Sequence, residues 1–384
     1  MRIGLVVAGG FDPSGRERVI PALLSLVERL ARRHAVHVFV LRYFDAPRTY
    51  ELAGATVHDL GRPSGVRRQR AALIRALRAA GRFDALHGYW ATPAGVAAGL
   101  AGRVLRVPVV LTLDSGELVT LPDIAYGLER TWRGRAAVKL ACRLAARVTV
   151  CSAFMQALAR DRGIDARFVP LGVDCAAFAE AVRPAEGPPW RLLQVASLNR
   201  VKDQATLLRA LADLRRRGLA VGLDLVGEDT LDGSLGALAA DLDLTSQVTF
   251  HGFAPTDALP ALYGRAHLYV QSSRHEAAGV SVLEAAASGT PVVGTAVGYV
   301  KDWARLRAVA VPAGDPQALA DGIAELLGDP ERRPRLAAAA RAWACTHDAD
   351  WTAEQFVEIY GELTLNVRGA GAGRAGAGAE RAKE

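Results

Sequence analysis

Two glutamates, Glu276 and Glu284, stand on either side of a glycine turn. The turn itself contains Gly279, Val280 and Ser281, and it follows a short apolar run and opens a helical pattern. Free N–H groups at a helix start bind anions, and glycine lets a phosphate approach the backbone. A diphosphate would fit there, with Glu284 placed to accept hydrogen bonds from ribose hydroxyls and Glu276 in the loop before the helix. The pattern predicts a nucleotide-sugar site, although a single glutamate on a helix is more often a solvated charge.

A cationic turn follows another apolar run, residues 191–196. This turn contains Ser197, Arg200 and Lys202. A cation at this place can neutralise the charge that builds up on a departing diphosphate, which stabilises the transition state. We assign that role to Lys202, with Arg200 as a second source of charge and Ser197 in the same donor-binding turn. For Arg200 an ordinary surface arginine is the alternative.

Both segments require strands that end at one edge of a sheet. Short β-branched runs alternate with longer helical patterns along the chain, which is typical of parallel strands joined by crossover helices. The pattern restarts after a Pro- and Gly-rich stretch near residues 183–190, and 384 residues exceed the size of most single cores. We therefore expect an α/β fold of two doubly wound domains. Ligands of such sheets bind at the carboxyl ends of the strands, so the chemistry is expected between the domains.

The expected boundaries follow from this alternation. An N-terminal domain covers residues 1–182, a linker covers 183–190 and a second domain covers 191–345. Residues 346–366 are expected to form a helix that crosses back to the N-terminal domain. Residues 367–384 are Gly-Ala-Arg repeats without periodicity, and we expect them to be disordered.

The glutamate segment resembles the E-x7-E signature of family 4 of the retaining glycosyltransferases, with Glu276 and Glu284 as its two glutamates. The resemblance implies the GT-B fold, in which two Rossmann-like domains face an interdomain cleft. In that family the first glutamate lies near the transferred sugar and is implicated in catalysis, and the second binds the donor ribose. Lys202 matches the lysine that contacts the donor phosphates. The resemblance implies transfer of a sugar from a nucleotide diphosphate sugar to an acceptor hydroxyl, with retention of configuration, in cell-envelope or exopolysaccharide synthesis.

The same resemblance places the acceptor, a sugar or a lipid-linked molecule, on the N-terminal domain. Gly10, Ser14 and Gly15 lie in a strand-to-helix loop that is similar to the family's glycine-rich loop near donor and acceptor. His87 and Asp114 lie in segments that resemble the strand ends facing the acceptor. We expect His87 to hydrogen-bond a sugar or an acceptor hydroxyl and to take part in catalysis. A structural histidine with satisfied ring nitrogens is the alternative.

Departures from the family pattern keep other functions open. Ser197 stands where an arginine is usual, Ala278 where an aromatic residue is usual and Asp114 where a histidine is frequent. The alternatives are a noncatalytic nucleotide-sugar binding subunit, or an epimerase or phosphorylase on the same fold. The four cysteines show no disulfide or zinc spacing, and no Asp-x-Asp motif ends a strand of the first domain. We expect no metal and no cofactor besides the donor.

The formal charge of +7 is unevenly distributed. Residues 1–180 carry 26 Lys and Arg against 15 Asp and Glu, and the remainder carries 21 against 25. A basic half can meet nucleic acid, anionic lipid or an acidic substrate, but no nucleic-acid motif accompanies it, so we expect no nucleic-acid partner. A bias toward arginine that is unrelated to binding also explains the charge.

The stretch from Arg62 to Arg82 is rich in arginine, with apolar residues interleaved at helical spacing. Such a helix either rests on anionic lipid headgroups or packs its apolar stripe on the sheet. No apolar run approaches the roughly 20 residues of a membrane helix. We expect a cytoplasmic protein, with peripheral contact at the inner face of the membrane as the alternative that the arginine-rich stretch leaves open.

Overall fold

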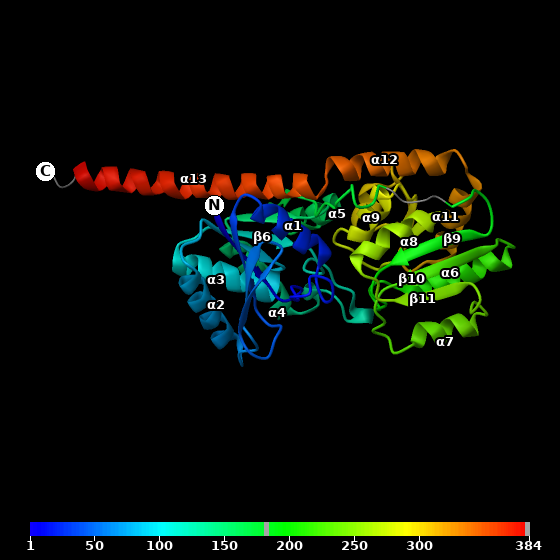
Figure 1. The fold of residues 1–384 in the computed structure, drawn as a ribbon, viewed down its shortest axis with the longest axis horizontal. Coiled ribbons are helices and arrows are strands. Elements are labelled where there is room, and N and C mark those ends of the chain that lie inside the picture. The colour runs from blue at the N-terminus through cyan, green and yellow to red at the C-terminus, as the bar shows by residue number, and fades with distance from the viewer. Residues whose placement is uncertain (180–183, 381–384) are drawn as a thin grey trace.

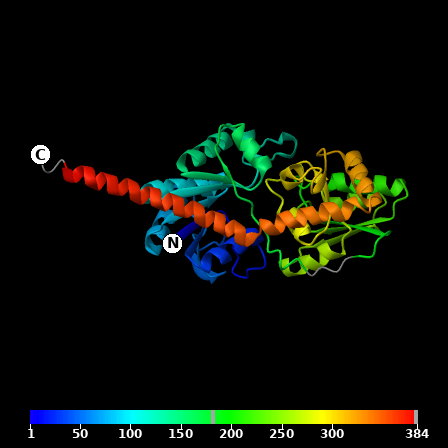
Figure 2. The same cartoon turned by 90° about the horizontal axis from the view of Figure 1, so that it is seen from above.

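The computed structural model describes residues 1–179 and 184–380, with side chains described up to residue 365. Two α/β domains lie side by side, and a long C-terminal helix leaves the second domain to run along the first (Figures 1 and 2). Each domain is built on one sheet with helices on both of its faces. This is the two-domain Rossmann-like architecture expected from the alternation of strands and helices.

The N-terminal sheet has the strand order β3-β4-β2-β1-β5-β6-β7-β8, and only β3 is antiparallel to its neighbour. Its strands are β1 (Arg2–Val7), β2 (Ala35–Val40), β3 (Arg48–Leu52), β4 (Ala55–Asp59), β5 (Ala85–Tyr89), β6 (Val109–Leu113), β7 (Arg147–Val150) and β8 (Arg167–Phe168). The central strands are apolar throughout because helices cover both faces. The helices are α1 (Pro21–Ala31), α2 (Val66–Ala80), α3 (Val96–Leu105), α4 (Trp132–Leu144) and α5 (Ala153–Arg160), with short turns η1 (Ala91–Gly95), η2 (Pro122–Ile124) and η3 (Leu128–Arg130).

The C-terminal sheet is parallel, with the order β11-β10-β9-β12-β13-β14. Its strands are β9 (Trp190–Val195), β10 (Val221–Val226), β11 (Val248–Gly252), β12 (Leu268–Gln271), β13 (Val292–Thr295) and β14 (Ala308–Val311). The helices are α6 (Gln204–Arg216), α7 (Ser234–Asp241), α8 (Leu259–Arg265), α9 (Val280–Ala287), α10 (Gly298–Asp302), α11 (Pro316–Gly328) and α12 (Arg332–Thr346), with the short turn η4 (Thr256–Ala258). The order of strands reverses between β9 and β12, and ligands of open sheets bind at such a switch point.

Helix α13 (Ala349–Glu380) returns to the N-terminal domain and packs beside α1. Phe356, Ile359 and Tyr360 are fully buried in the core that α1 and β1 form on this face of the sheet. The buried Arg29 guanidinium of α1 pairs with Asp350 of α13 and with Asp174 of the segment that joins β8 to β9, each at 3.1 Å. The N-terminal core is therefore complete only when α13 is in place.

The ends of the predicted segments differ from the structure in two places. The predicted linker, residues 183–190, lies partly outside the described residues, and its last residue, Trp190, begins β9. The segment from residue 367, predicted to be disordered, is helical as far as Glu380 and projects past the N-terminal domain. Extending an existing helix needs no new nucleus, so α13 continues through this segment even though its frequent glycines are weak helix formers.

Replacing Phe356 by alanine tests the dependence of the N-terminal core on α13. The substitution removes a fully buried ring, and we expect the free energy of unfolding to fall by about 3 to 5 kcal/mol in urea titrations. The control is Glu354→Ala on the exposed side of the same helix, which we expect to change stability by less than about 0.5 kcal/mol. Equal stabilities of the two variants would show that the domain folds without this contact.

Candidate active site

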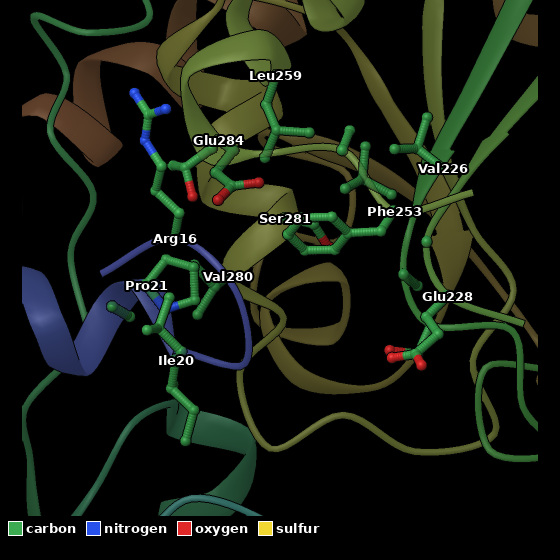
Figure 3. Close-up of a pocket in the computed structure, with 18 of the residues that line it drawn as sticks. Arg16, Ile20, Pro21, Val226, Glu228, Phe253, Leu259, Val280, Ser281 and Glu284 are labelled. Atoms are coloured by element: carbon green, nitrogen blue, oxygen red, sulfur yellow. The ribbon is translucent and has the colours of Figure 1, made fainter. Parts of the chain in front are cut away.

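A cavity of about 580 Å³ lies between the domains, at the carboxyl ends of the C-terminal strands. The ends of β9 and β10, the loop after β11 and the first turns of α9 form one side of it. Residues 16–22, which are the end of the connection from β1 and the first two residues of α1, form the other side. Figure 3 shows Arg16, Ile20 and Pro21 of this connection facing α9 and Phe253 across the cavity.

The start of α9 forms one wall of the cavity through Val280 and Ser281. Gly279 caps this helix with φ +94°, and a Cβ there would lie 2.8 Å from Gln271 Oε1. The positive φ and the close approach together require glycine at this position. The first N–H groups of an α-helix have no partner within the helix. The geometry suits an anionic group at this end of the cavity.

Glu284, one turn further along α9, lines the same cavity (Figure 3). Only 7% of the residue is exposed, and the Tyr263 hydroxyl donates a hydrogen bond of 2.7 Å to its Oε2. Burial raises the pKa of Glu284, and the hydrogen bond from Tyr263 lowers it. A carboxylate held in this way can accept hydrogen bonds from ligand hydroxyls.

Lys202 and Glu276 form an ion pair, with Nζ 2.6 Å from Oε1. The Ser273 hydroxyl donates to the same carboxylate oxygen at 2.7 Å. The Asn199 side chain accepts hydrogen bonds from the Val201 and Lys202 amides, both at 3.0 Å, and so orders the turn that carries the lysine. Neither member of the pair is among the residues that line the cavity, but Glu276 Cγ is 3.8 Å from the place of a Cβ on Gly279, so the pair adjoins the glycine turn. A cation and a carboxylate thus lie side by side next to the start of α9.

The loop that carries Glu276 is attached to the N-terminal domain by the residues on both sides of it. The His275 Nε2 atom lies 3.1 Å from the Ser115 carbonyl oxygen, and the Ser152 hydroxyl donates to the Ala277 carbonyl oxygen. Asp114, at the end of β6, is half-buried close to this loop. Burial raises the pKa of Asp114 to about 6; Glu276 raises this pKa as well, whereas the Cys151 side chain and Lys202 lower it. Asp114 therefore interacts electrostatically with both members of the ion pair.

Glu117 is a functional candidate that the sequence analysis missed. It is 1% exposed and accepts hydrogen bonds from the Ala91 amide at 3.3 Å and the Ser115 amide at 2.7 Å. Burial raises the pKa of Glu117 to about 7. The side chain ties the loop after β5 to the loop after β6, next to Asp114. The sequence signal for Glu117 is a charged residue shortly after the end of β6. Asp114, which directly follows the same strand, is the residue that the sequence pattern predicts for the site.

The structure contradicts the expected contact between His87 and a ligand. His87 is fully buried, with Nε2 2.7 Å from Thr112 Oγ1 and Nδ1 2.6 Å from the Tyr360 hydroxyl. Burial lowers the pKa of His87 to about 3, so the ring is neutral at physiological pH. Both ring nitrogens are satisfied, and α13 covers the ring. His87 is a structural histidine that holds α13 against β5.

Of the other predicted residues, four line the cavity and four do not. Ser197, Val280, Ser281 and Glu284 line the cavity. Gly10, Ser14 and Gly15 lie in the loop just before the cavity-lining residues 16–22, and Arg200 is exposed at the surface. Arg16, Glu228 and Phe253 complete the cavity from loops without any repeated pattern, so the sequence alone does not predict them.

Comparisons with known proteins identify the family of the chain. A family model described as Glycosyltransferase Family 4 matches residues 22–177, and one described as Glycosyl transferases group 1 matches residues 178–343. A D-inositol 3-phosphate glycosyltransferase of Salinispora arenicola is 34% identical over 343 residues, which cover 81% of this chain and 76% of the relative. The chain belongs to the family 4 glycosyltransferases.

Further relatives and solved structures extend the comparison. A GDP-mannose-dependent alpha-(1-6)-phosphatidylinositol monomannoside mannosyltransferase of Mycobacterium tuberculosis is 33% identical over 46% of this chain and 50% of its own. Sucrose-phosphate synthase from Thermosynechococcus elongatus superposes with a TM-score of 0.79 at 23% identity, covering 95% of this chain and 99% of that one. Anabaena HepE, solved with UDP and glucose, superposes with a TM-score of 0.72 at 20% identity, covering 94% and 100%. These structures share the GT-B fold of this glycosyltransferase.

The glycosyltransferase has no membrane-crossing helix in the part of the chain that the structure describes, since none there is both long and apolar enough.

The raised pKa of Glu117 gives a stability test. The folded chain keeps this proton up to about pH 7, whereas the unfolded chain loses it near 4.5. The unfolded state therefore binds fewer protons in that window, and burying Glu117 costs stability as the pH rises. We expect the wild type to lose roughly 3 kcal/mol relative to Glu117→Gln between these pH values, at about 1.4 kcal/mol per pKa unit. Urea unfolding of both proteins at several pH values measures the difference, and a difference that stays constant with pH would refute the assignment.

Proposed function

We propose that this glycosyltransferase moves a sugar from a nucleotide diphosphate sugar to an acceptor hydroxyl with retention of the anomeric configuration. The observation that carries the proposal is the Lys202–Glu276 ion pair beside the start of α9, with Glu284 in the adjoining cavity. This arrangement places a cation paired with one carboxylate next to a helix start that suits an anion, beside a cavity between two domains that contains the second carboxylate.

In this proposal the donor nucleotide occupies the cavity. The ribose hydroxyls bind Glu284, and the diphosphate lies at the amides of Gly279 and Val280, where the helix dipole favours negative charge. Two findings support a nucleotide-sugar donor: the mycobacterial relative is named as GDP-mannose-dependent, and HepE was solved with UDP-glucose. The cavity of about 580 Å³ is within the usual range of small-ligand sites.

The chemical step breaks the bond between the anomeric carbon and the donor phosphate oxygen and forms a bond from that carbon to the acceptor oxygen. Negative charge develops on the leaving diphosphate, and Lys202, Arg200 and the amides at the start of α9 stabilise it. The leaving phosphate takes the acceptor proton on the same face of the sugar, as the family resemblance implies. Glu276 holds Lys202 in place and lies near the transferred sugar. No cofactor besides the donor enters this scheme.

We place the acceptor, a sugar or a lipid-linked molecule, on the N-terminal side near Asp114. The relatives are named for inositol 3-phosphate and phosphatidylinositol monomannoside, both of which carry a cyclic polyol on a phosphate or a lipid. A role in cell-envelope or exopolysaccharide synthesis belongs to the proposal. So does peripheral contact of the region from Arg62 to Arg82 with the inner face of the membrane. In the structure this region contains α2, whose Leu73 and Leu77 are buried against the sheet.

Ligand-induced stabilisation tests the donor site. A nucleoside diphosphate or nucleotide sugar that binds only the folded chain must raise the melting temperature. We expect one nucleotide base to raise it most, and Glu284→Gln to weaken that ligand by about 10-fold, because the amide presents one acceptor oxygen instead of two. The matched control is Asp241→Asn at an exposed position of α7 in the same domain. Equal affinity in the Glu284 and Asp241 variants would remove the ribose assignment.

Replacing Glu276 by glutamine tests catalysis. The variant keeps a hydrogen-bonding side chain but loses the charge that faces Lys202. We expect kcat to fall by about 100-fold or more, with the donor Kd changed only a few-fold. The assay follows nucleoside diphosphate release on addition of acceptor.

Three other outcomes of that assay would count against the proposal. Unchanged turnover in Glu276→Gln would reject the role of this residue. Interconversion of sugar nucleotides without release of nucleoside diphosphate would indicate an epimerase. Tight donor binding without turnover on any acceptor or phosphate would indicate a noncatalytic binding subunit.

A further inference from the structure

Helices α2, α3 and α4 form one layer on the N-terminal sheet, with α3 in contact with both of the others. We call their outer surface the basic face. These three helices contain ten basic residues and no acidic ones. The basic residues are Arg67, Arg68, Arg70, Arg75 and Arg78 in α2, Arg103 in α3, and Arg133, Arg135, Lys139 and Arg143 in α4.

The opposite layer of the same domain has the reverse charge. Helix α1 and residues 349–365 of α13 contain five acidic residues and one basic one, Arg29, which is buried in ion pairs. The acidic residues are Glu28, Asp350, Glu354, Glu358 and Glu362. A compositional preference for arginine over lysine does not account for the absence of acids from one layer only. The separation of charge points to an anionic partner for the basic face.

Large apolar side chains lie exposed on the basic face. Trp132 is 68% exposed and Leu140 42% exposed on α4, and Val104 is 53% exposed at the end of α3. On α4 the exposed residues Trp132, Ala136, Lys139 and Arg143 recur at three- and four-residue spacing and so form one stripe along the helix. Tryptophan and leucine between basic residues are typical of helices that lie in a membrane interface.

A second cavity, of about 550 Å³, opens beside α4. Arg135, Lys139 and Arg143 line it, together with Glu129 and Asp165. The mixed lining suits a headgroup that carries both a phosphate and hydroxyls. The two carboxylates in the lining would repel the continuous row of phosphates of a nucleic acid backbone, so the cavity favours a single headgroup.

We propose that the basic face docks on an anionic lipid bilayer, with Trp132 and Leu140 of α4 inserted at the level of the headgroups. This surface extends the contact expected of the region from Arg62 to Arg82 and moves its inserting part to α4, because the two leucines of α2, Leu73 and Leu77, are buried. The docking itself does not depend on the proposed function; only its purpose, to bring the site close to a lipid-linked acceptor, rests on that function. Helix α4 follows directly on the segment 114–131 that begins at Asp114, so docking brings the acceptor side close to the membrane and to a lipid-linked acceptor.

Vesicle co-sedimentation of the full chain tests the proposal, with phosphatidylcholine vesicles and with vesicles that also contain phosphatidylglycerol. We expect binding only to the anionic vesicles and a decrease with added salt. The double variant R133E/K139E should bind at least about 25-fold more weakly, at about fivefold for each basic residue lost. The matched control R209E/R335E changes the charge equally at exposed sites of α6 and α12 and should bind like the wild type.

Tryptophan emission separates insertion from simple charge attraction. The chain has six tryptophans, so the blue shift on adding anionic vesicles is compared between wild type and Trp132→Phe. The shift should be lost in the variant, and Trp132→Ser should weaken vesicle binding several-fold.

The outcomes that overturn the proposal are distinct from a failure of the proposed function. Equal binding to both kinds of vesicle, or equal loss in the two double variants, rejects the membrane surface. Tighter binding to duplex DNA than to anionic vesicles at physiological salt indicates a nucleic acid partner instead. Donor binding, followed by thermal shift in the absence of vesicles, should be the same in R133E/K139E and in the wild type. If no protein, the wild type included, bound the donor, that result would reject the proposed transfer reaction and leave the membrane surface unaffected.

Discussion

The site depends on one constraint, the attachment of the loop around Glu276 to the N-terminal domain. Its neighbours on both sides bind that domain, His275 at the Ser115 carbonyl and Ala277 at the Ser152 hydroxyl. Tyr299, at the start of α10, adds a hydrogen bond of 2.8 Å to the Cys151 carbonyl. Because Lys202 is paired with Glu276, the position of the cation follows from the same attachment. The reactive groups of the donor domain therefore have a fixed relation to the strand ends of the acceptor-side domain.

Burial sets the charges around this loop. Asp114 and Glu117 lie in the loop after β6, and burial raises the pKa of both, to about 6 and about 7. Glu276 is among the causes that raise the pKa of Asp114, and Asp114 among those that raise the pKa of Glu117. The raised pKa values mean that these two carboxyl groups add less negative charge beside the ion pair than two carboxyl groups with ordinary pKa values would.

The sequence predicts those parts of the site that rest on local pattern. Alternation of apolar runs and helices predicts two parallel sheets, and a glycine turn between two glutamates predicts the anion site at α9, because both depend on residues close together in the chain. His87 and Glu117 depend on partners that local pattern does not reveal. His87 is a structural residue only because Tyr360, 273 positions away, covers it. Phe253 and Arg16 reach the cavity from loops whose course is set by packing between the domains.

The return of α13 also explains why the two faces of the N-terminal domain differ. A sheet covered by the chain's own last helix needs complementary charges across that contact, and Asp350 and Glu358 provide them for Arg29 and Arg167. Among the described residues no helix packs on the outer side of the layer of α2 to α4, so the charge of that layer is free to be of one sign. In the proposed docking, anionic headgroups attract this layer and repel the acidic layer opposite. The same charge distribution that favours attachment would then also set the orientation, with α13 on the side of the domain that faces away from the membrane.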